Sequence, residues 1–288
     1  MAINWFPGHM KKTQREIKEN LKLVDAVIEI RDARIPRSSA NPDIEKLLEG
    51  KPRIILLNKS DLTDSNVTKE WIDYLTNDIV RVLEVNCLKG DGLKNIKPML
   101  LNLLKEKHDR LRAKGMVNIM MRVMVVGIPN VGKSTFINKM ARNNIAKTGD
   151  RPGVTKSKQW IKTGAGIELL DTPGVLWPKF EDDETALDLA FTGAIKDEIM
   201  DIEELALKLV DRLQESYEAK LKERYKLTEV FENPLDTLDA IGKKRGTLIS
   251  GGQIDYNRLA VILLDEFRAG KMGKISLERP GEEENEDN

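Results

Sequence analysis

The sequence contains the segment Gly127-Ile128-Pro129-Asn130-Val131-Gly132-Lys133-Ser134. It follows an apolar run, residues 122–126, and it opens residues 134–141, where apolar side chains recur at helical spacing. Backbone N–H groups in such a strand-to-helix turn form a nest for anions. An ordinary glycine-rich turn is the alternative, but every fixed position of a phosphate-binding loop is filled here. We therefore expect phosphate contacts from Val131, Gly132, Lys133, Ser134 and Thr135, with the Ser134 hydroxyl also ligating Mg²⁺.

Strand-like and helix-like segments alternate on both sides of this loop. Strands are predicted at residues 26–30, 53–57, 80–85, 122–126, 160–162 and 168–170. Helices are predicted at residues 7–23, 42–50, 67–75, 93–113 and 134–141. This alternation indicates a mainly parallel sheet covered on both faces, with an antiparallel hairpin at its edge. After about residue 178 the strand pattern stops, and only helices are predicted.

A second motif, Asn58-Lys59-Ser60-Asp61, directly follows the apolar residues 54–57. A carboxylate at Asp61 can accept from both N1–H and N2–H₂ of guanine, whereas adenine offers no such pair of donors. Asn58 is expected to brace the neighbouring loops, and the stem of Lys59 to cover the base. Four residues in isolation also fit a polar turn. Beside a phosphate-binding loop, however, they predict a guanine site. Asn86 and Cys87, which follow the next predicted strand, partly match a further segment that binds the base in GTPases.

A third motif, Asp171-Thr172-Pro173-Gly174, ends the last predicted strand. Asp171 is expected to hold Mg²⁺ through water, and the Gly174 N–H to meet the γ-phosphate. Thr155, between this motif and the phosphate loop, is the candidate for a further Mg²⁺ contact, with Ser157 as a competitor. Mg²⁺ is therefore the expected cofactor.

The order of these motifs is reversed, because the guanine motif precedes the phosphate loop. The expected fold is therefore α/β, a circularly permuted P-loop GTPase domain of Ras-like type, followed by a smaller all-helical domain. We place the first domain at residues 1–178, the helical domain at 179–281 and a disordered acidic tail at 282–288. The helix at 7–23 takes the place of the one that normally follows the second switch.

The position that usually holds a water-orienting glutamine is apolar here, at Val175 and Leu176. His9, at the start of the first helix, is the best substitute, because an imidazole can orient or deprotonate water near neutral pH. A surface histidine that caps the helix is the alternative, and it remains open on these residues alone. His108 lies on a charged helix, where we expect it to be solvated.

Composition excludes several classes of protein. The chain has 47 basic and 47 acidic residues, which argues against bulk coating of nucleic acid, and no DNA partner is expected. A single cysteine excludes an internal disulfide framework and suits a reducing compartment. No apolar run approaches the roughly 20 residues that span a bilayer. We expect a monomer in the cytoplasm, without a membrane partner.

The motifs together resemble a known family, the circularly permuted GTPases of ribosome assembly. The resemblance covers nearly the whole chain and includes Trp5-Phe6-Pro7-Gly8-His9-Met10, Asp32-Ala33-Arg34-Ile35-Pro36 and Thr192-Gly193-Ala194-Ile195-Lys196. It implies GTP hydrolysis stimulated by the large (50S) ribosomal subunit, and a role in that subunit's late maturation in the bacterial cytoplasm. It also implies that His9 is catalytic and that Asn130 binds a K⁺ ion near the phosphates.

An RNA partner must be argued from local charge. Residues 241–279 hold eight basic and four acidic side chains, a net charge of +4. We expect Lys243, Lys244 and Arg245 to form a loop that meets rRNA phosphates, together with Lys11, Lys12 and Arg15 of the first helix. A solvated charged loop is the alternative. Two other functions also stay open: a GTP-gated RNA-binding module, and a permuted GTPase acting on the small subunit or in tRNA modification.

Overall fold

The computed structural model describes residues 15–142, 160–164, 166–172, 174, 176, 182–197 and 200–281. These residues form two compact units. The first contains the described residues up to 176 together with 278–281, and the second contains residues 182–277.

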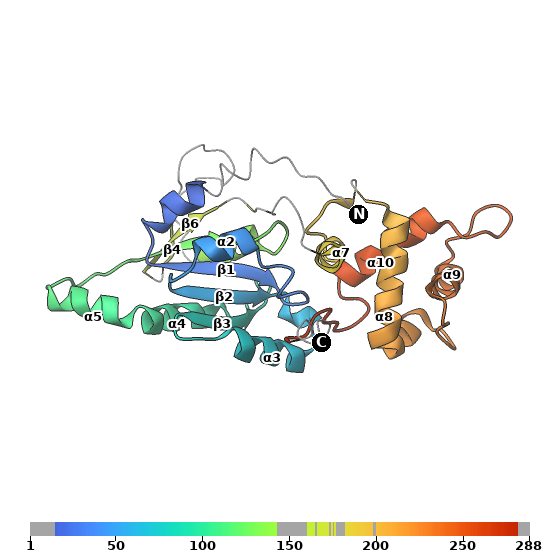
Figure 1. Ribbon diagram of the computed structural model, residues 1–288, viewed down its shortest axis with the longest axis horizontal. Helices are drawn as coiled ribbons and strands as arrows, with labels where there is room; N and C mark the ends of the chain where they lie inside the picture. The colour runs from blue at the N-terminus through green and yellow to red at the C-terminus, as the bar shows by residue number, and fades with distance from the viewer. Residues whose placement is uncertain are drawn as a thin grey trace. The chain divides into compact units, whose positions relative to one another are not determined.

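The first unit is built on a six-stranded sheet in the order β3-β2-β1-β4-β6-β5 (Figure 1). All neighbours are parallel except β5 and β6, which pair antiparallel. The expected mainly parallel sheet with an antiparallel edge is therefore confirmed. The strands are β1 Ala26–Asp32, β2 Arg53–Asn58, β3 Val80–Val85, β4 Met121–Val126, β5 Trp160–Lys162 and β6 Ile167–Asp171.

The parallel strands end at one edge of the sheet. Asp32 pairs with Asn58, and Asn58 pairs with Val85, so β1, β2 and β3 stop together. Asp171 at the end of β6 pairs with Val125 of β4. The segments that follow these strands are thereby gathered at the edge where open α/β sheets bind their ligands.

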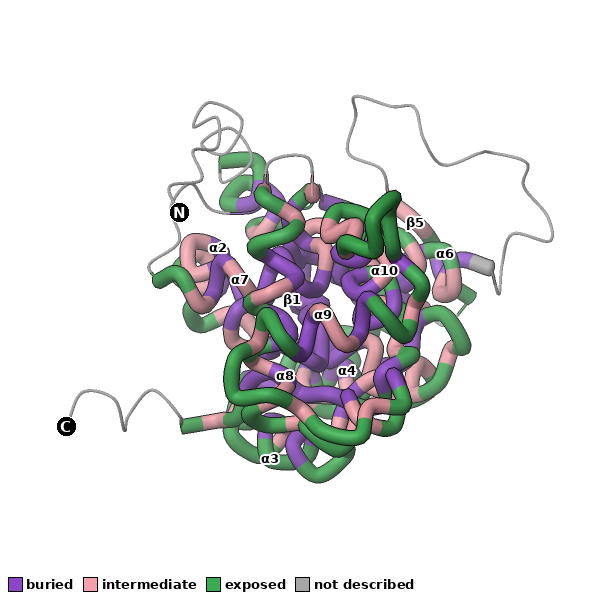
Figure 2. Tube along the Cα trace, turned by 90° about the vertical axis from the view of Figure 1, so that its right-hand side faces the viewer, coloured by how far each residue is buried: buried purple, intermediate pink, exposed green. Residues whose placement is uncertain are grey.

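Both faces of the sheet are buried, as the purple interior of Figure 2 shows. One face carries two apolar clusters, of which the first joins β1, β4 and β6 to the helical residues 15–21 and to α2, Pro42–Leu47. The second joins β2 and β3 to α3, Ser65–Leu75, through Val67 and Trp71. Ile28, Ile30, Ile54 and Leu56 alternate with these residues and are fully buried, so the opposite face is covered too.

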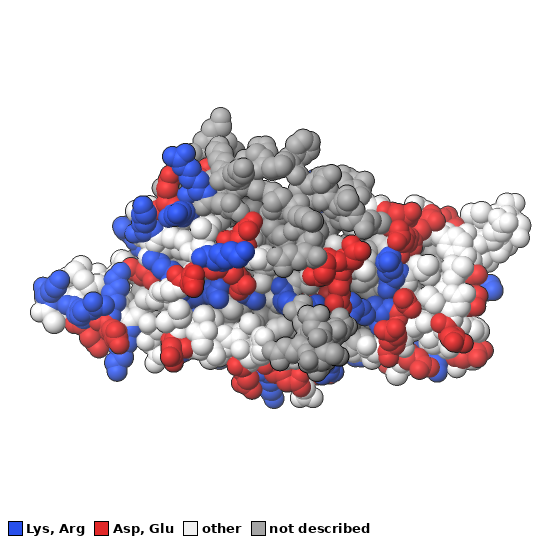
Figure 3. All heavy atoms as spheres, viewed as in Figure 1, with Lys and Arg blue, Asp and Glu red and all other residues white. Residues whose placement is uncertain are grey.

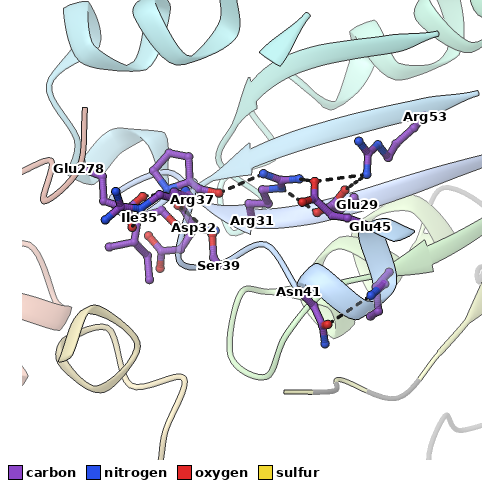
Figure 4. Close-up of polar contacts among 12 residues, drawn as sticks. Glu29, Arg31, Asp32, Ile35, Arg37, Ser39, Asn41, Glu45, Arg53 and Glu278 are labelled. Carbon is purple, nitrogen blue, oxygen red and sulfur yellow. Dashed lines mark hydrogen bonds and ion pairs between the residues drawn. The ribbon is translucent and has the colours of Figure 1, made fainter. Parts of the chain in front are cut away.

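A buried polar network separates the two clusters (Figure 4). Arg31 donates to Glu29 at 2.7 Å and to Glu45 of α2 at 2.6 Å, and Arg53 donates to Glu29 at 3.0 Å. Burial opposes ionisation of Arg31, but Glu29 and Glu45 together raise the pKa of its guanidinium. These charges are satisfied inside the sheet face, which keeps α2 fixed over β1.

The long helix predicted at 93–113 is broken into shorter pieces. A 3₁₀ turn, η2 Leu93–Asn95, leads into α4 Ile96–Leu103, and α5 Lys105–Ala113 follows after Leu104, which has φ −102° and ψ 15°. His108 lies one turn beyond the buried Leu104, on the same side of the helix, and is 5% exposed. The expectation that His108 is solvated was therefore wrong. The other helices of this unit are η1 Ser60–Leu62 and α6 Lys133–Arg142.

The second unit is all helical, with α7 Asp183–Phe191, α8 Ile202–Tyr225, α9 Pro234–Arg245 and α10 Tyr256–Arg268. Its core includes the fully buried Leu209 and Leu263, and α8 packs against both α9 and α10. Arg268 of α10 donates to Asp197 at 2.7 and 2.8 Å and to the carbonyls of Ala190 and Phe191. It thereby ties the segment after α7 to the end of α10.

The basic run Lys243-Lys244-Arg245 is helical, which corrects the predicted loop. Gly242 suggested a helix end, but it lies inside α9, where an added Cβ would come within 3.0 Å of Ile254 and Leu259. Glycine is therefore required there for close packing. The helix stops at Gly246, which has φ 66°.

Residues 278–281 belong with the sheet unit, whereas the sequence placed them in the helical domain. Glu278 is bound by backbone groups of residues 37 and 38, a contact across 240 positions that no local pattern reveals. On the face drawn in Figure 3, acidic and basic side chains are intermixed over the described residues. No helix in the described part of the chain is both long and apolar enough to cross a membrane.

Candidate functional site

The phosphate-loop segment occupies the turn between β4 and α6, as the sequence predicted. Gly127 has φ 152°, and a Cβ there would stand 2.5 Å from the carbonyl oxygen of Ile30 at the end of β1. Asn130 and Gly132 adopt φ 60° and 103°. Such left-handed residues turn successive N–H groups toward one point, which is the geometry of an anion nest.

Lys133 is folded back over this loop. Its ammonium donates to the carbonyl of Ile128 at 2.6 Å, and burial lowers its pKa to about 8, with Asp171 opposing the shift. A Cβ on Gly174 would come within 2.5 Å of the Lys133 Nζ. The Pro129 backbone nitrogen would stand 3.2 Å from the same Cβ, so the third motif lies close against the phosphate loop.

The two motifs line a cavity of about 410 Å³. Ser134 and Asp171 face it from α6 and the end of β6, and the cavity also contains Asn130, Lys133 and Gly174. A hydroxyl and a carboxylate beside a phosphate nest are the oxygen donors that Mg²⁺ takes in nucleotide sites. The residues present therefore fit Mg²⁺. Thr155, expected to complete this set, lies outside the described residues, as does His9.

Asn58 joins the guanine segment to the phosphate loop. Its Nδ2 donates to the Val131 carbonyl at 2.7 Å, and its Oδ1 accepts the Cys87 N–H at 2.9 Å. The side chain is 4% exposed, and a Cβ on Gly132 would strike its Nδ2 at 2.3 Å. These two hydrogen bonds of Asn58 hold three loops together.

Lys59 and Asp61 lie on the turn that follows β2. Lys59 adopts φ 63° and its ammonium stands 2.9 Å from Asp32 Oδ2, whereas the Asp61 carboxylate, 36% exposed, is 3.4 Å from Lys89 Nζ. The carboxylate of Asp61 is therefore accessible at the edge of the sheet. Lys89 is the counter-ion that a guanine base would meet beside it.

Asn86 and Cys87 form the turn after β3. The Asn86 side chain accepts the Lys89 N–H at 2.9 Å, and its own N–H donates to the Asp91 carbonyl at 3.1 Å. Cys87 is fully buried, and burial raises the pKa of its thiol to about 12. The Cys87 side chain is therefore structural, and this residue can offer a base only its backbone.

The structure places the candidate RNA-contacting residues in different surroundings. Arg15 is 84% exposed and stands 3.4 Å from Glu19, and Lys243 and Lys244 are exposed on the last turn of α9. Arg245 instead donates to Glu266 at 2.6 Å and lies 4.9 Å from the centre of the Tyr225 ring, so it holds the helical core. Lys11 and Lys12 lie outside the described residues.

Sequence reasoning missed the part that Asp32 plays at this site. Its carboxylate is buried and receives Lys59 Nζ together with Arg34 Nε and Nη2 at 2.8–2.9 Å. Burial opposes its ionisation, but Arg34 and Lys59 hold the pKa of Asp32 well below its usual range. The role of Asp32 could have been predicted from the charged residues at the end of β1, because this strand ends at the same sheet edge as the guanine motif.

Comparison with known proteins agrees with this geometry. The family described as 50S ribosome-binding GTPase matches residues 122–238. Ribosome biogenesis GTPase A of Bacillus licheniformis is 52% identical over 280 residues, covering 97% of this chain and 99% of that protein. A GNP-bound structure of YlqF from T. maritima is 29% identical with a TM-score of 0.64 and covers 94% of this chain and 99% of its own. A GDP-bound structure of TM YlqF is also 29% identical, with a TM-score of 0.66, covering 92% of this chain and 99% of its own. The chain belongs to the ribosome biogenesis GTPase A family.

Proposed function

We propose that this chain binds GTP and GDP, hydrolyses GTP, and uses that cycle to promote late maturation of the large ribosomal subunit in the bacterial cytoplasm. The observation that carries the proposal is the pair of hydrogen bonds made by Asn58, which joins the guanine segment to the phosphate loop. A guanine reader and a phosphate nest held in one rigid frame recognise a guanine nucleotide. The relatives named above extend this to ribosome assembly.

Hydrolysis in this scheme depends on charge placed around the phosphates. Lys133, already beside the loop, exchanges the Ile128 carbonyl for phosphate oxygens, which favours its protonated form. Ser134 and Asp171 would hold Mg²⁺, with Thr155 as a further ligand, and the ion would neutralise charge that develops on the phosphates. Gly174 lines the same cavity, and its N–H would donate to the γ-phosphate.

The attacking water needs a residue to orient it. The residue after Gly174 is Val175, whose apolar side chain cannot orient water, so we assign this role to His9. We further assign a K⁺ ion to Asn130, whose side chain lines the phosphate cavity. Such a cation would supply the positive charge that other GTPases take from an arginine.

The partner is the rRNA of the large subunit, bound by a monomer of this chain. Lys243 and Lys244 support this, because they are exposed on the last turn of α9. We assign Lys11, Lys12 and Arg15 to a second contact with the same RNA. Lysines of this kind read RNA backbone and shape, since few aromatic side chains are available to stack on bases.

The test is the rate of GTP hydrolysis, measured in K⁺ and in Na⁺ buffer, with purified large or small ribosomal subunits. We expect acceleration by the large subunit alone, and a higher rate in K⁺. Acceleration by the small subunit would replace the partner, and no acceleration by either would withdraw it. Equal rates in the two salts would remove the K⁺ assignment.

A variant separates the enzyme from a mere GTP-gated binding module. His9→Ala should bind large subunits in the presence of GTP and remain trapped on them, because release requires hydrolysis. The control is the same variant with GDP, which should not be retained. Normal binding and normal release by His9→Ala would contradict the enzymatic proposal.

A further inference from the structure

The chain returns to the sheet unit at Glu278, directly after Leu277 of the helical unit. The Glu278 side chain is 3% exposed, and its carboxylate accepts the N–H of Arg37 at 2.7 Å and of Ser38 at 2.9 Å. Its own carbonyl accepts the indole N–H of Trp71 at 3.2 Å. A buried carboxylate with two backbone donors makes strong, charge-assisted hydrogen bonds. The returning segment is therefore fixed at its first residue.

The groups that bind Glu278 belong to the loop at residues 32–41, which connects β1 to α2. Figure 4 shows Glu278 beside Arg37, at one end of this loop, with Asp32 and Ser39 close by. The Ser39 hydroxyl accepts the Asp32 N–H at 3.0 Å and donates to the Ile35 carbonyl at 2.6 Å. The Ile35 N–H donates to the Asp32 carbonyl at 3.0 Å. Because the loop is bonded to itself in this way, a displacement at Ser38 is carried to Asp32.

Asp32 in turn holds the guanine segment. Its Oδ2 receives Lys59 Nζ at 2.9 Å, and the Ala33 N–H donates to the Asn58 carbonyl at 2.8 Å. Lys59, which is 26% exposed and in a left-handed conformation, is the residue whose stem is expected to cover the base. A continuous set of hydrogen bonds and short loop segments thus runs from Glu278 to Lys59.

We infer that Glu278 is a positioning residue for the guanine-binding segment, acting through the 32–41 loop and Asp32 on Lys59. The inference rests on the proposed function, because a guanine nucleotide is the ligand that Lys59 meets. In the chain, the helical unit is inserted between the Asp171–Gly174 motif and Glu278. Glu278 is therefore the second point at which the chain connects the two units.

The experiment is a double-mutant cycle on GDP affinity, measured with a fluorescent GDP analogue on the full chain. The variants are Glu278→Gln, Lys59→Met and the two combined. Glu278→Gln keeps the size of the side chain, but it replaces one of the two accepting carboxylate oxygens with an NH₂ group. That group faces a backbone N–H donor and cannot accept its hydrogen bond. We expect it to weaken GDP binding about five- to tenfold. In the Lys59→Met background, where the last member of the path is gone, the same change should alter affinity less than about twofold.

Steady-state kinetics give a readout that a general loss of structure would not produce. Glu278→Gln should raise KM for GTP while kcat stays at the wild-type value, because the phosphate end of the site is untouched. Glu70→Gln is the matched control, since Glu70 stands 3.7 Å from Arg279 of the same segment and its side chain is half exposed. It should leave both constants unchanged.

The outcomes that overturn the inference are specific. Wild-type affinity in Glu278→Gln, or the same fold loss with and without Lys59, would show that Glu278 does not act on the base-binding segment. If Glu278→Gln does not fold, Ser39→Ala takes its place in the cycle, under the same criteria. Failure of the unmodified chain to bind GDP would instead refute the proposed function, and this inference with it.

Discussion

Single residues at this site serve several loops at once, and Asn58 shows the consequence. Asn58→Ala leaves the Val131 carbonyl and the Cys87 N–H without their partner, and both lie in a buried setting. The change should lower the free energy of unfolding by about 1–3 kcal/mol and weaken nucleotide binding more than tenfold. Thermal melting and a nucleotide titration measure the two effects. Asn66→Ala, at an exposed position on α3, is the control, and equal losses in both variants would contradict this role.

Cys87 provides a chemical probe of the same region, because it is the only cysteine in the chain. Burial raises its pKa from 9.0 to about 12, so the native thiol keeps its proton near neutral pH and should react slowly with a disulfide reagent such as DTNB. The unfolded chain loses this proton near pH 9 and the folded chain only near 12. The stability tied to this group is therefore complete below pH 9 and is lost as pH rises toward 12. Rapid modification of the native thiol at pH 8, matching the rate in denaturant, would contradict its burial.

For single residues, the sequence predicted which residues lie in the site better than it predicted which residues they contact. The positions of Lys133, Ser134 and Asp171 follow from motifs whose backbone geometry is local. The partners of Asp32 and Glu278 do not, since one lies across a strand and the other across 240 residues of chain. The prediction that His108 is solvated was wrong for the same reason. Charged neighbours in the sequence do not show which side of a helix packs against the rest of the protein.

Among the elements, α9 shows how two adjacent basic residues can have different tasks. Lys244 is exposed on its last turn, whereas Arg245 is bonded to Glu266 of α10 at 2.6 Å. Lys244→Gln should weaken binding to the large subunit and reduce the slope of log affinity against log salt by ~0.7–0.9, with melting unchanged. Arg245→Gln should instead lower the stability of the helical unit by about 1 kcal/mol. Salt-dependent binding and thermal melting separate the two, with Lys208→Gln on α8 as the exposed control. Equal effects of Lys244→Gln and Lys208→Gln on binding would remove α9 from the interface.

Element boundaries were predictable where a local signal sets them. Asn41 and Pro42 begin α2, and Asn41 accepts the N–H groups of residues 43 and 44 as its cap. Gly242 misled the prediction for α9, because its glycine serves contact with Ile254 and Leu259 and not a turn. The break at Leu104 was equally hidden, since the helical pattern of residues 93–113 runs through it. Tertiary packing decided the case of Gly242.

At the scale of the whole molecule, the helical unit has a closed core of its own although it is inserted between residues 176 and 278. Ligand that binds only the sheet unit stabilises it by mass action, about 2.7 kcal/mol at a hundredfold excess over Kd. Hydrogen exchange with saturating GDP should therefore slow in β2 and in the segment after β4. In contrast, exchange in the interior of α8, around Leu209, should stay at its ligand-free rate, because its partners α9 and α10 lie within the same unit. The 32–41 loop tests the link to the base-binding segment. Because Asp32 of this loop is paired with Lys59, GDP should slow hydrogen exchange in the loop of the unmodified chain as well. Equal protection of α8 and β2 would show that the two units unfold as one.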